Sequence, residues 1–221
     1  MQVFILGATG LVGGHAFQKS LAKGWQVSTV TRKPLEGGKN TVEADLEKWP
    51  SIIETEAKGY DAFITAFGTT RAKAGGMDGF RKIDYGTNYE AAKAAKAAGV
   101  STFVLVSLAG ALQGSLFPYL DSKGKLEDDI IALKFPKTVI LRPGALVGER
   151  KDSHGWANDI TMRFGAWTHN TPLNFLTYGI PGADVATVAV YEAANAKDGV
   201  TIISPGDLIK KANELNQQAL S

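Results

Sequence analysis

One short stretch, QVFILGATGLVGG at residues 2–14, restricts the possible folds more than any other part of the chain. An apolar run that favours a β-strand is followed by Gly7, Gly10 and Gly13 and then by a helical pattern. In such a strand–turn–helix unit the glycines allow a tight turn, close approach of the backbone to a pyrophosphate, and close packing of helix on strand. The N–H groups of the first helical turn then face the phosphates. The stretch therefore predicts dinucleotide binding, with a purely structural glycine turn as the alternative.

The rest of the chain alternates between strand-like and helical segments. Strands are predicted at residues 25–31, 40–44, 60–67, 102–107 and 138–141, and helices near residues 50–58, 77–98, 118–134 and 183–196. This α/β alternation predicts a Rossmann-like, doubly wound parallel sheet with helices on both faces. Ligands of such sheets bind beyond the C-terminal ends of the strands, where the strand order reverses.

The chain length fits one NAD(P)-binding domain over residues 1–221, because no Pro/Ser-rich linker divides it. Residues 148–181 are aromatic-rich and are expected to form a small substrate-side insertion, either as a packed subdomain or as the roof of an apolar pocket. The glycine-rich segment 68–79 carries Arg71 and Lys73, and is either a flap over an anionic group or an ordinary surface loop.

Composition excludes several other classes of protein. The net charge is only +2, which gives no reason to expect binding to nucleic acid. The chain has no cysteine, and its three histidines are far apart, so no metal site is expected. The longest mostly apolar stretch, Phe103 to Leu112, is too short to span a membrane. Because the first strand starts at residue 2, no targeting peptide is expected, and we predict a cytoplasmic protein.

The end of the second predicted strand indicates which nicotinamide cofactor is preferred. NAD-dependent proteins place an acid there to bind the ribose 2′-hydroxyl, whereas NADP requires positive charge for its 2′-phosphate. The sequence reads Thr31, Arg32, Lys33, which favours NADPH/NADP+, although two basic residues can also form a solvated turn. Further along the predicted edge, the residues expected to meet the adenine and the ribose, or else to be ordinary loop residues, are Asp45, Leu46, Ala66, Phe67 and Gly68.

Ser107, Tyr119 and Lys123 are the candidate catalytic residues. A tyrosine four residues before a lysine places both side chains on one face of a helix, where an ammonium group can lower the pKa of a tyrosine from about 10. Tyr89 and Lys93 have the same spacing. We favour Tyr119 because its helix follows the fifth predicted strand, which ends at Ser107, whose hydroxyl could hold a substrate carbonyl. A chance pairing is the alternative.

The motifs also resemble those of a known group. GATGLVGG, Ser107 with YLDSK, and LRPG at residues 141–144 resemble the short-chain dehydrogenase/reductase superfamily in its atypical or extended branch. FGTTRAKAGGMDGF at residues 67–80, KGKLE after Tyr119, and LRPGALVGER resemble the Tat-interacting-protein-like reductases, a subgroup that includes fungal proteins of mitochondrial proteomes. The resemblance covers residues 2–150 well and the remainder loosely.

This resemblance implies hydride transfer between NADP(H) and a small carbonyl or quinone-type substrate. Tyr119 would give the proton, Lys123 would hold the nicotinamide ribose, and Ser107 would orient the substrate. A weakly catalytic NADPH sensor acting through a protein partner is the alternative, and peripheral attachment to the outer surface of mitochondria is also compatible. The cofactor-binding residues expected besides those above are Thr9, Leu11 and Val12 near the glycine turn, and Pro143, Gly144 and Leu146 beside the nicotinamide.

Overall fold

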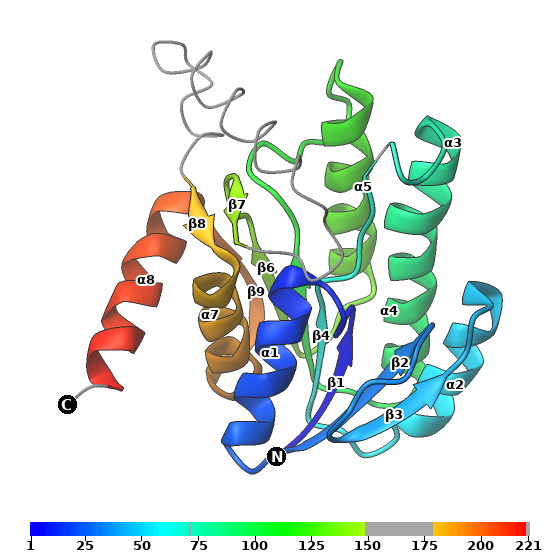
Figure 1. Cartoon of the computed structure of the whole chain (residues 1–221). Coiled ribbons are helices and arrows are strands. Elements are labelled where there is room, and N and C mark those ends of the chain that lie inside the picture. The colour runs from blue at the N-terminus through cyan, green and yellow to red at the C-terminus, as the bar shows by residue number, and fades with distance from the viewer. Residues whose placement is uncertain (71, 149–178, 220–221) are drawn as a thin grey trace.

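The computed structural model describes residues 1–70, 72–148 and 179–219, and seven strands in these ranges form one parallel sheet (Figure 1). Their order is β3-β2-β1-β4-β5-β6-β9. The strands are β1 (Gln2–Leu6), β2 (Gln26–Thr31), β3 (Lys39–Val42), β4 (Ala62–Thr65), β5 (Thr102–Val106), β6 (Lys137–Leu141) and β9 (Gly199–Ile203). The chain builds outward from β1 to β3 and then returns to β4 on the other side of β1. The strand order therefore reverses between β1 and β4.

Helices cover both faces of the sheet (Figure 1). One face packs against α1 (Leu11–Ala22), α7 (Gly182–Asn195) and α8 (Pro205–Gln218), and the other against α2 (Trp49–Glu56), α4 (Asn88–Ala97) and α5 (Pro118–Ala132). These features confirm the predicted Rossmann-like doubly wound fold.

The alternation of side chains along each strand explains the two cores. Val3 and Ile5 belong to the core on the α1 and α7 side, whereas Phe4 belongs to the core on the α2, α4 and α5 side. In the second core, Phe4, Phe63 and Phe103 stack across three neighbouring strands, with ring centroids 5.2 and 5.3 Å apart. Because buried parallel strands need apolar residues on both faces, they appear in the sequence as continuous apolar runs.

Three parts of the chain differ from the prediction. The helix expected over residues 77–98 consists of α3 (Met77–Phe80), a π-helix, η2 (Arg81–Thr87), and α4. Strand β9 and helix α8 were not predicted. β9 has exposed residues at its start, whereas α8 begins with ordinary start signals, an N-cap at Ser204 and a proline in the first turn, which the prediction overlooked. A short 3₁₀-helix, η1 (Leu46–Lys48), also precedes α2.

The segment expected to be a substrate-side insertion begins and ends in a small second sheet. β7 (Leu146–Val147) and β8 (Ile180–Pro181) pair in parallel, and the Ile180 N–H donates to the carbonyl oxygen of Ala145 over 2.9 Å. Residues 149–178, with the aromatic residues noted in the sequence, lie outside the described residues, as does Arg71. The insertion therefore stays a prediction.

Candidate functional site

The glycine turn lies at the point where the strand order reverses. Gly7 has a φ of 90°, and a Cβ atom there would lie 2.7 Å from the backbone nitrogen of Phe67, at the end of β4. A Cβ at Gly13 would overlap the carbonyl oxygen of Gly7, so α1 can pack this closely only with glycine at that position. Gly10, the N-cap of α1, provides no side-chain cap, which leaves N–H groups of the first helical turn available to an anion. The turn therefore fits a dinucleotide pyrophosphate.

Other residues predicted around this turn differ in exposure. Thr9 is exposed, Leu11 is half-buried and Val12 is buried in the core. The side chain of Leu11 lies close to Gly148 and Gly182, the residues that follow β7 and β8. The start of α1 therefore contacts the small second sheet, next to the predicted cofactor edge.

The basic turn after β2 is held in place by its own side chains. The hydroxyl of Thr31 donates to the carbonyl oxygen of Lys33 over 2.6 Å and is within hydrogen-bond distance of Asn40. Arg32 and Lys33 are both exposed on this fixed turn. They are therefore presented at the C-terminal end of β2, where an adenosine 2′-phosphate would be recognised in this fold.

Asp45 and Leu46 have clear structural roles. The carboxylate of Asp45 caps η1 by accepting the Glu47 N–H over 2.9 Å, and Leu46 packs against the second core. Their predicted contact with the adenine stays a prediction. Beyond β4, the rings of Phe67 and Trp49 pack edge to face with centroids 5.2 Å apart, while Ala66 packs against the first core. Gly68, the third residue predicted there, is exposed.

Tyr119 and Lys123 lie one turn apart at the N-terminal end of α5. The Tyr119 side chain is 41% exposed, and its ring packs against Phe80 of α3 with centroids 4.9 Å apart. Lys123 is buried, and its ammonium group forms an ion pair with Asp84 of η2. Sequence reasoning missed Asp84. A polar residue within an otherwise helical pattern carries little signal of its own, because its contact with Lys123 is made only in the tertiary structure.

Ser107 belongs to a second buried network. Its hydroxyl donates to Glu127, which is 1% exposed. Glu127 also accepts from Arg142, whose Nη2 lies 2.5 Å and Nε 3.1 Å from Oε2. Sequence reasoning missed both charged residues, although Glu127 follows Lys123 by four positions and hence shares its helix face. This network joins the ends of β5 and β6 to α5.

The LRPG segment continues from β6 along the same edge. The Ser107 N–H donates to the carbonyl oxygen of Leu141, and the Ala109 N–H to that of Pro143, each over 2.8 Å. Gly144 and Leu146 follow as half-buried residues, and Leu146 begins β7. The segments after β5 and β6 are thus tied together where the resemblance expects the nicotinamide.

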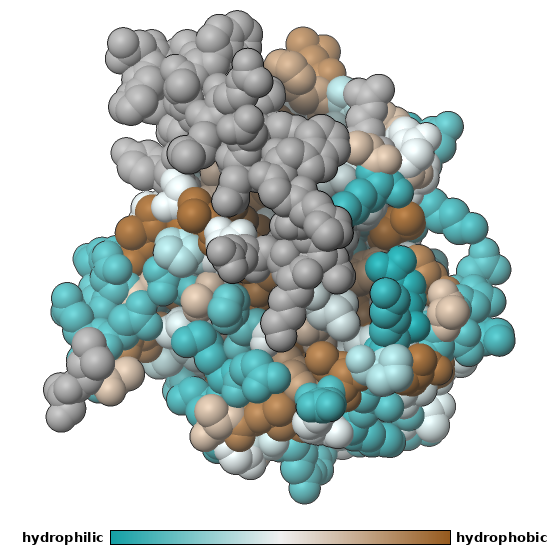
Figure 2. Space-filling model, in the orientation of Figure 1, coloured by the Kyte–Doolittle hydropathy of each residue, from teal (hydrophilic) through white to brown (hydrophobic). Residues whose placement is uncertain are grey.

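Exposed apolar side chains surround the start of α5. Figure 2 shows hydrophobic residues gathered at the top of the view, where Figure 1 shows the N-terminal end of this helix. Leu112, Leu116 and Phe117 are 64%, 97% and 65% exposed. An apolar surface therefore lies close in sequence and space to the candidate catalytic tyrosine.

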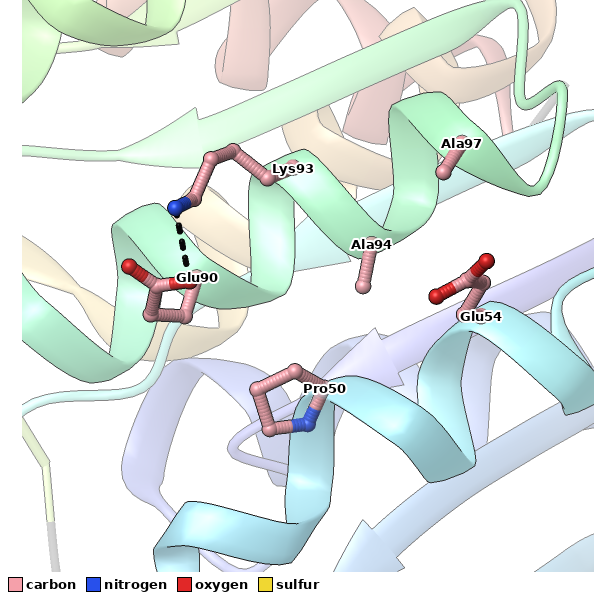
Figure 3. Close-up of a pocket in the computed structure, with 6 residues that line it drawn as sticks. All are labelled: Pro50, Glu54, Glu90, Lys93, Ala94 and Ala97. Carbon is pink, nitrogen blue, oxygen red and sulfur yellow. Dashed lines mark ion pairs between the residues drawn. The ribbon is translucent and has the colours of Figure 1, made fainter.

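The second tyrosine–lysine pair has different surroundings. Lys93 pairs with Glu90 over 2.8 Å on the same helix, and its Nζ lies 5.0 Å from the centroid of the Tyr89 ring. Figure 3 shows Lys93 and Glu90 at a pocket between α2 and α4 that is also lined by Pro50, Glu54, Ala94 and Ala97. This pocket lies between two helices that cover the same face of the sheet, and not at the strand ends.

The described residues contain neither a cluster of metal-binding side chains nor a membrane-spanning helix. Residues 1–70, 72–148 and 179–219 contain no group of three or more histidine or acidic side chains placed to hold a metal ion. Within the same ranges, no helix combines the length and apolar character that crossing a bilayer requires.

The fold and the glycine turn define a dinucleotide-binding protein, and comparison with known proteins agrees with this class. The sequence model of a family described as NAD(P)H-binding matches residues 7–196, so the chain contains an NAD(P)-binding Rossmann domain. The chain is 52% identical over 199 residues to "Protein FMP52, mitochondrial" of Debaryomyces hansenii, with 88% of each chain covered. The protein of the same name from Candida albicans is 47% identical over 229 residues, which cover 98% of this chain and 100% of that protein. The chain therefore belongs to the FMP52 family.

Solved structures with the same fold include two that were determined in complex with NAD. The chain matches MoeE5, solved in complex with UDP-glucose and NAD, with a TM-score of 0.71 at 17% identity over 98% of this chain and 82% of that one. It matches the Thermus thermophilus UDP-glucose 4-epimerase, solved in complex with NAD, with a TM-score of 0.67 at 17% identity over 98% and 84%. At these identities the matches establish the fold alone.

The expected cytoplasmic location is wrong. Relatives from several yeasts, including those of D. hansenii, Scheffersomyces stipitis and C. albicans, are named as mitochondrial proteins, which points to the mitochondrion. The prediction rested on the absence of a recognisable targeting segment before the first strand. Such an absence says little about location, since proteins reach organelles by routes that leave no N-terminal signal.

Proposed function

We propose that this protein is an NADPH-dependent oxidoreductase that reduces a small carbonyl or quinone-type substrate. The observation that carries the proposal is the position of Tyr119 and Lys123 on α5, at the same sheet edge as the glycine turn. When bound, NADPH would supply a hydride to the carbonyl carbon. Tyr119 donates its hydroxyl proton to the carbonyl oxygen, and the ammonium group of Lys123 stabilises the negative charge left on Tyr119.

The glycine turn and the basic turn after β2 support the cofactor part of the proposal. A Cβ atom at Gly7 or Gly13 would collide with neighbouring backbone, so the turn proposed to hold the pyrophosphate requires glycine at both positions. Arg32 and Lys33 are exposed beside the same edge and favour a 2′-phosphate over a free hydroxyl. The residues proposed to hold NADPH are Gly7, Thr9, Gly10, Leu11, Val12, Arg32, Lys33, Asp45, Leu46, Ala66, Phe67, Gly68, Tyr119, Lys123, Pro143, Gly144 and Leu146.

Ser107 is proposed to orient the substrate. In the structure its hydroxyl donates to Glu127, so it must turn its proton away from that carboxylate before it can donate to a carbonyl oxygen. A Ser107→Ala change is therefore expected to lower turnover less than a Tyr119→Phe change does. Turnover of the two variants at saturating NADPH tests this order, and an equal or larger loss in Ser107→Ala contradicts it.

The cofactor preference is tested by thermal unfolding. A ligand that binds only the folded state stabilises it by about 2.7 kcal/mol at a hundredfold excess over its Kd, so NADPH is expected to raise Tm more than NADH at equal concentration. Changing Arg32 and Lys33 together to alanine should remove that difference. Equal shifts with NADPH and NADH in the unmutated protein would show that the charge argument is wrong.

Catalysis is tested with a panel of aldehydes, ketones and quinones by following NADPH absorbance. Exposed apolar residues beside Tyr119 lead us to expect faster turnover of apolar carbonyl compounds than of charged ones. If the protein binds NADPH tightly and reduces nothing in the panel, the proposed oxidoreductase activity is contradicted. It would favour a nucleotide sensor that acts through a protein partner.

A further inference from the structure

The buried ion pair between Lys123 and Asp84 joins α5 to the π-helix η2. The side chain of Lys123 is 8% exposed and that of Asp84 is 3% exposed. Removing two charges from water is costly, and a buried ion pair is often no more stabilising than apolar residues of similar volume. Stability alone is therefore a weak reason for placing a carboxylate beside this lysine.

Asp84 is also attached to the segment that follows β4. Its Oδ1 atom accepts the Thr69 N–H over 3.1 Å, and a Cβ atom at Gly68 would lie only 2.7 Å from the same oxygen. The Asp84 carboxylate thus connects the loop after β4 to α5, because Oδ1 accepts a hydrogen bond from that loop and Oδ2 pairs with Lys123. Both places belong to the predicted cofactor edge.

The backbone around Asp84 is fixed by a second side chain. The Nδ2 atom of Asn88 donates to the carbonyl oxygens of Asp84 over 2.7 Å and of Phe67 over 3.1 Å, and Oδ1 of Asn88 accepts from the Thr65 hydroxyl over 2.5 Å. Asp84 itself is the central residue of the seven-residue π-helix Arg81–Thr87. Such wider helical turns occur often at functional sites, where they place a side chain that a regular helix would direct elsewhere.

Two of the carboxylates on α5 itself, Glu127 and Asp129, have partners of their own. Glu127 is bound to Arg142 and Ser107, and Asp129 is bound to Lys125 and to the hydroxyl of Tyr85. The counter-charge for Lys123 therefore comes from η2, a separate element whose position depends on the segment after β4.

We propose that Asp84 is a positioning residue for Lys123. It holds the ammonium group at the cofactor edge before NADPH arrives, and it couples the position of Lys123 to that of residues 67–69. Preorganisation of this kind lowers the cost of assembling the site when cofactor and substrate bind. The inference rests on the proposed function, because it assigns a task to Asp84 only through Lys123.

A double-mutant cycle tests whether Asp84 acts through Lys123. Asp84→Asn keeps an oxygen that can accept from the Thr69 N–H and replaces the oxygen that faces Lys123 with an uncharged NH2 group. Turnover at saturating NADPH and the Kd for NADPH are measured for Asp84→Asn, Lys123→Met and the double variant. Asp84→Asn is expected to lower turnover by roughly 10- to 100-fold, the range that small misplacement of a catalytic group costs.

The double variant, Asp84→Asn with Lys123→Met, gives the decisive result. If Asp84 acts through Lys123, adding Asp84→Asn to Lys123→Met produces no further loss of turnover and no further rise in Kd. The matched control is Asp129→Asn, which removes the partner of Lys125 on the same helix and is expected to leave turnover and Kd unchanged. The Kd values complete the cycle even without a good substrate.

Contrary outcomes separate the two proposals. If Lys123→Met lowers turnover while Asp84→Asn behaves like the unmutated protein, the role of Asp84 is wrong and the proposed function stands. If the two losses multiply in the double variant, Asp84 acts independently of Lys123 and the inference also fails. If Lys123→Met changes neither turnover nor Kd, the proposed role of Lys123 itself is wrong. Should Lys123→Met alone fail to fold, Lys123→Gln takes its place in the cycle with the same expected and contrary outcomes, because its uncharged amide can still donate a hydrogen bond to the Asp84 carboxylate.

Discussion

The tyrosine–lysine pairs of α4 and α5 have the same spacing and different surroundings. On α5, Lys123 is buried and paired with a carboxylate of another element. On α4, the Lys93 side chain is 44% exposed and pairs with Glu90, three residues earlier on the same helix. A spacing of four residues brings two side chains onto one helix face in both cases. Which lysine is withdrawn from solvent depends on its partner in the tertiary structure. The four-residue spacing alone does not determine it.

The largest expected difference between the pairs concerns catalysis. Tyr119→Phe removes the proposed proton donor and keeps the ring that packs on Phe80, so turnover should fall by about 10²- to 10⁴-fold while NADPH binding changes little. Tyr89→Phe, the matched change on α4, should leave turnover intact. The measurement is NADPH oxidation with the best substrate of the panel. Equal turnover in the two variants would show that the acid has been assigned to the wrong residue.

Stability should separate the two lysines next. Lys123→Met leaves Asp84 buried without its partner, and the free energy of unfolding should fall by about 3–5 kcal/mol. Lys93→Met removes an exposed ion pair and should leave the free energy of unfolding essentially unchanged. Urea denaturation measures both. A double variant, Asp84→Asn with Lys123→Met, should regain much of the loss, and no recovery would argue against a direct pair.

A substitution outside both helices should disturb only the α5 pair. At Gly68, an added methyl group would press on Oδ1 of Asp84, and overpacking of this kind costs about 1–3 kcal/mol. Gly68→Ala should therefore destabilise the protein and lower turnover. The control is Gly86→Ala, in the π-helix that holds Asp84. A Cβ at Gly86 would have an ordinary contact of 3.8 Å with the carbonyl oxygen of Arg81. If the Tm values of the two variants are equal, Asp84 has room to move.

The smallest expected effect lies at Tyr85, whose ring stacks on Tyr89 with centroids 5.8 Å apart. Partial burial raises the pKa of Tyr85, and the carboxylate of Asp129, which accepts its hydroxyl over 2.6 Å, raises it further. Because the folded state favours the neutral hydroxyl, this contribution to stability is present below the ordinary pKa of about 10 and is lost as the pH rises further.

Tyr85→Phe should remove this pH dependence. Between about pH 9 and pH 11, the free energy of unfolding is expected to fall more steeply in the unmutated protein than in the variant. The difference between the two declines should be less than about 1 kcal/mol, and urea denaturation at each pH measures it. Identical curves for the two proteins would mean that the Tyr85 hydroxyl contributes nothing to the fold.

The sequence predicted the parts of the fold that local pattern determines. The strand–turn–helix unit around Gly7 to Gly13 and the buried strands have apolar runs and glycine positions that few other structures require. Strand β9 was missed because Val200 and Ile202 are exposed at the sheet edge and a short run there has no periodicity to recognise. The π-helix was missed because residues 77–98 fit one continuous helical pattern, and the wider turns appear only in the structure.

The candidate site divides in the same way. Tyr119 and Lys123 could be predicted because their spacing lies within one helix. Asp84 and Arg142 could not, because Asp84 precedes Lys123 by 39 positions and Arg142 lies beyond the next strand, and only the folded sheet brings these charges together. A buried ion pair between distant elements has no signature in a single sequence.

The order of strands in the sheet has a consequence for how the chain folds during synthesis. After β1 has paired with β2 and β4, each later strand in the series β5, β6, β9 adds to the outer side of the one before it. The growing sheet therefore extends in one direction, in the order in which the ribosome releases its strands. Among the described residues, β9 is the next strand after Leu141 to join the outer side of β6, and it begins at Gly199. At about 5–20 residues per second the interval between them lasts several seconds. During that time β6 is an unprotected edge, to which a neighbouring nascent chain can pair before β9 arrives.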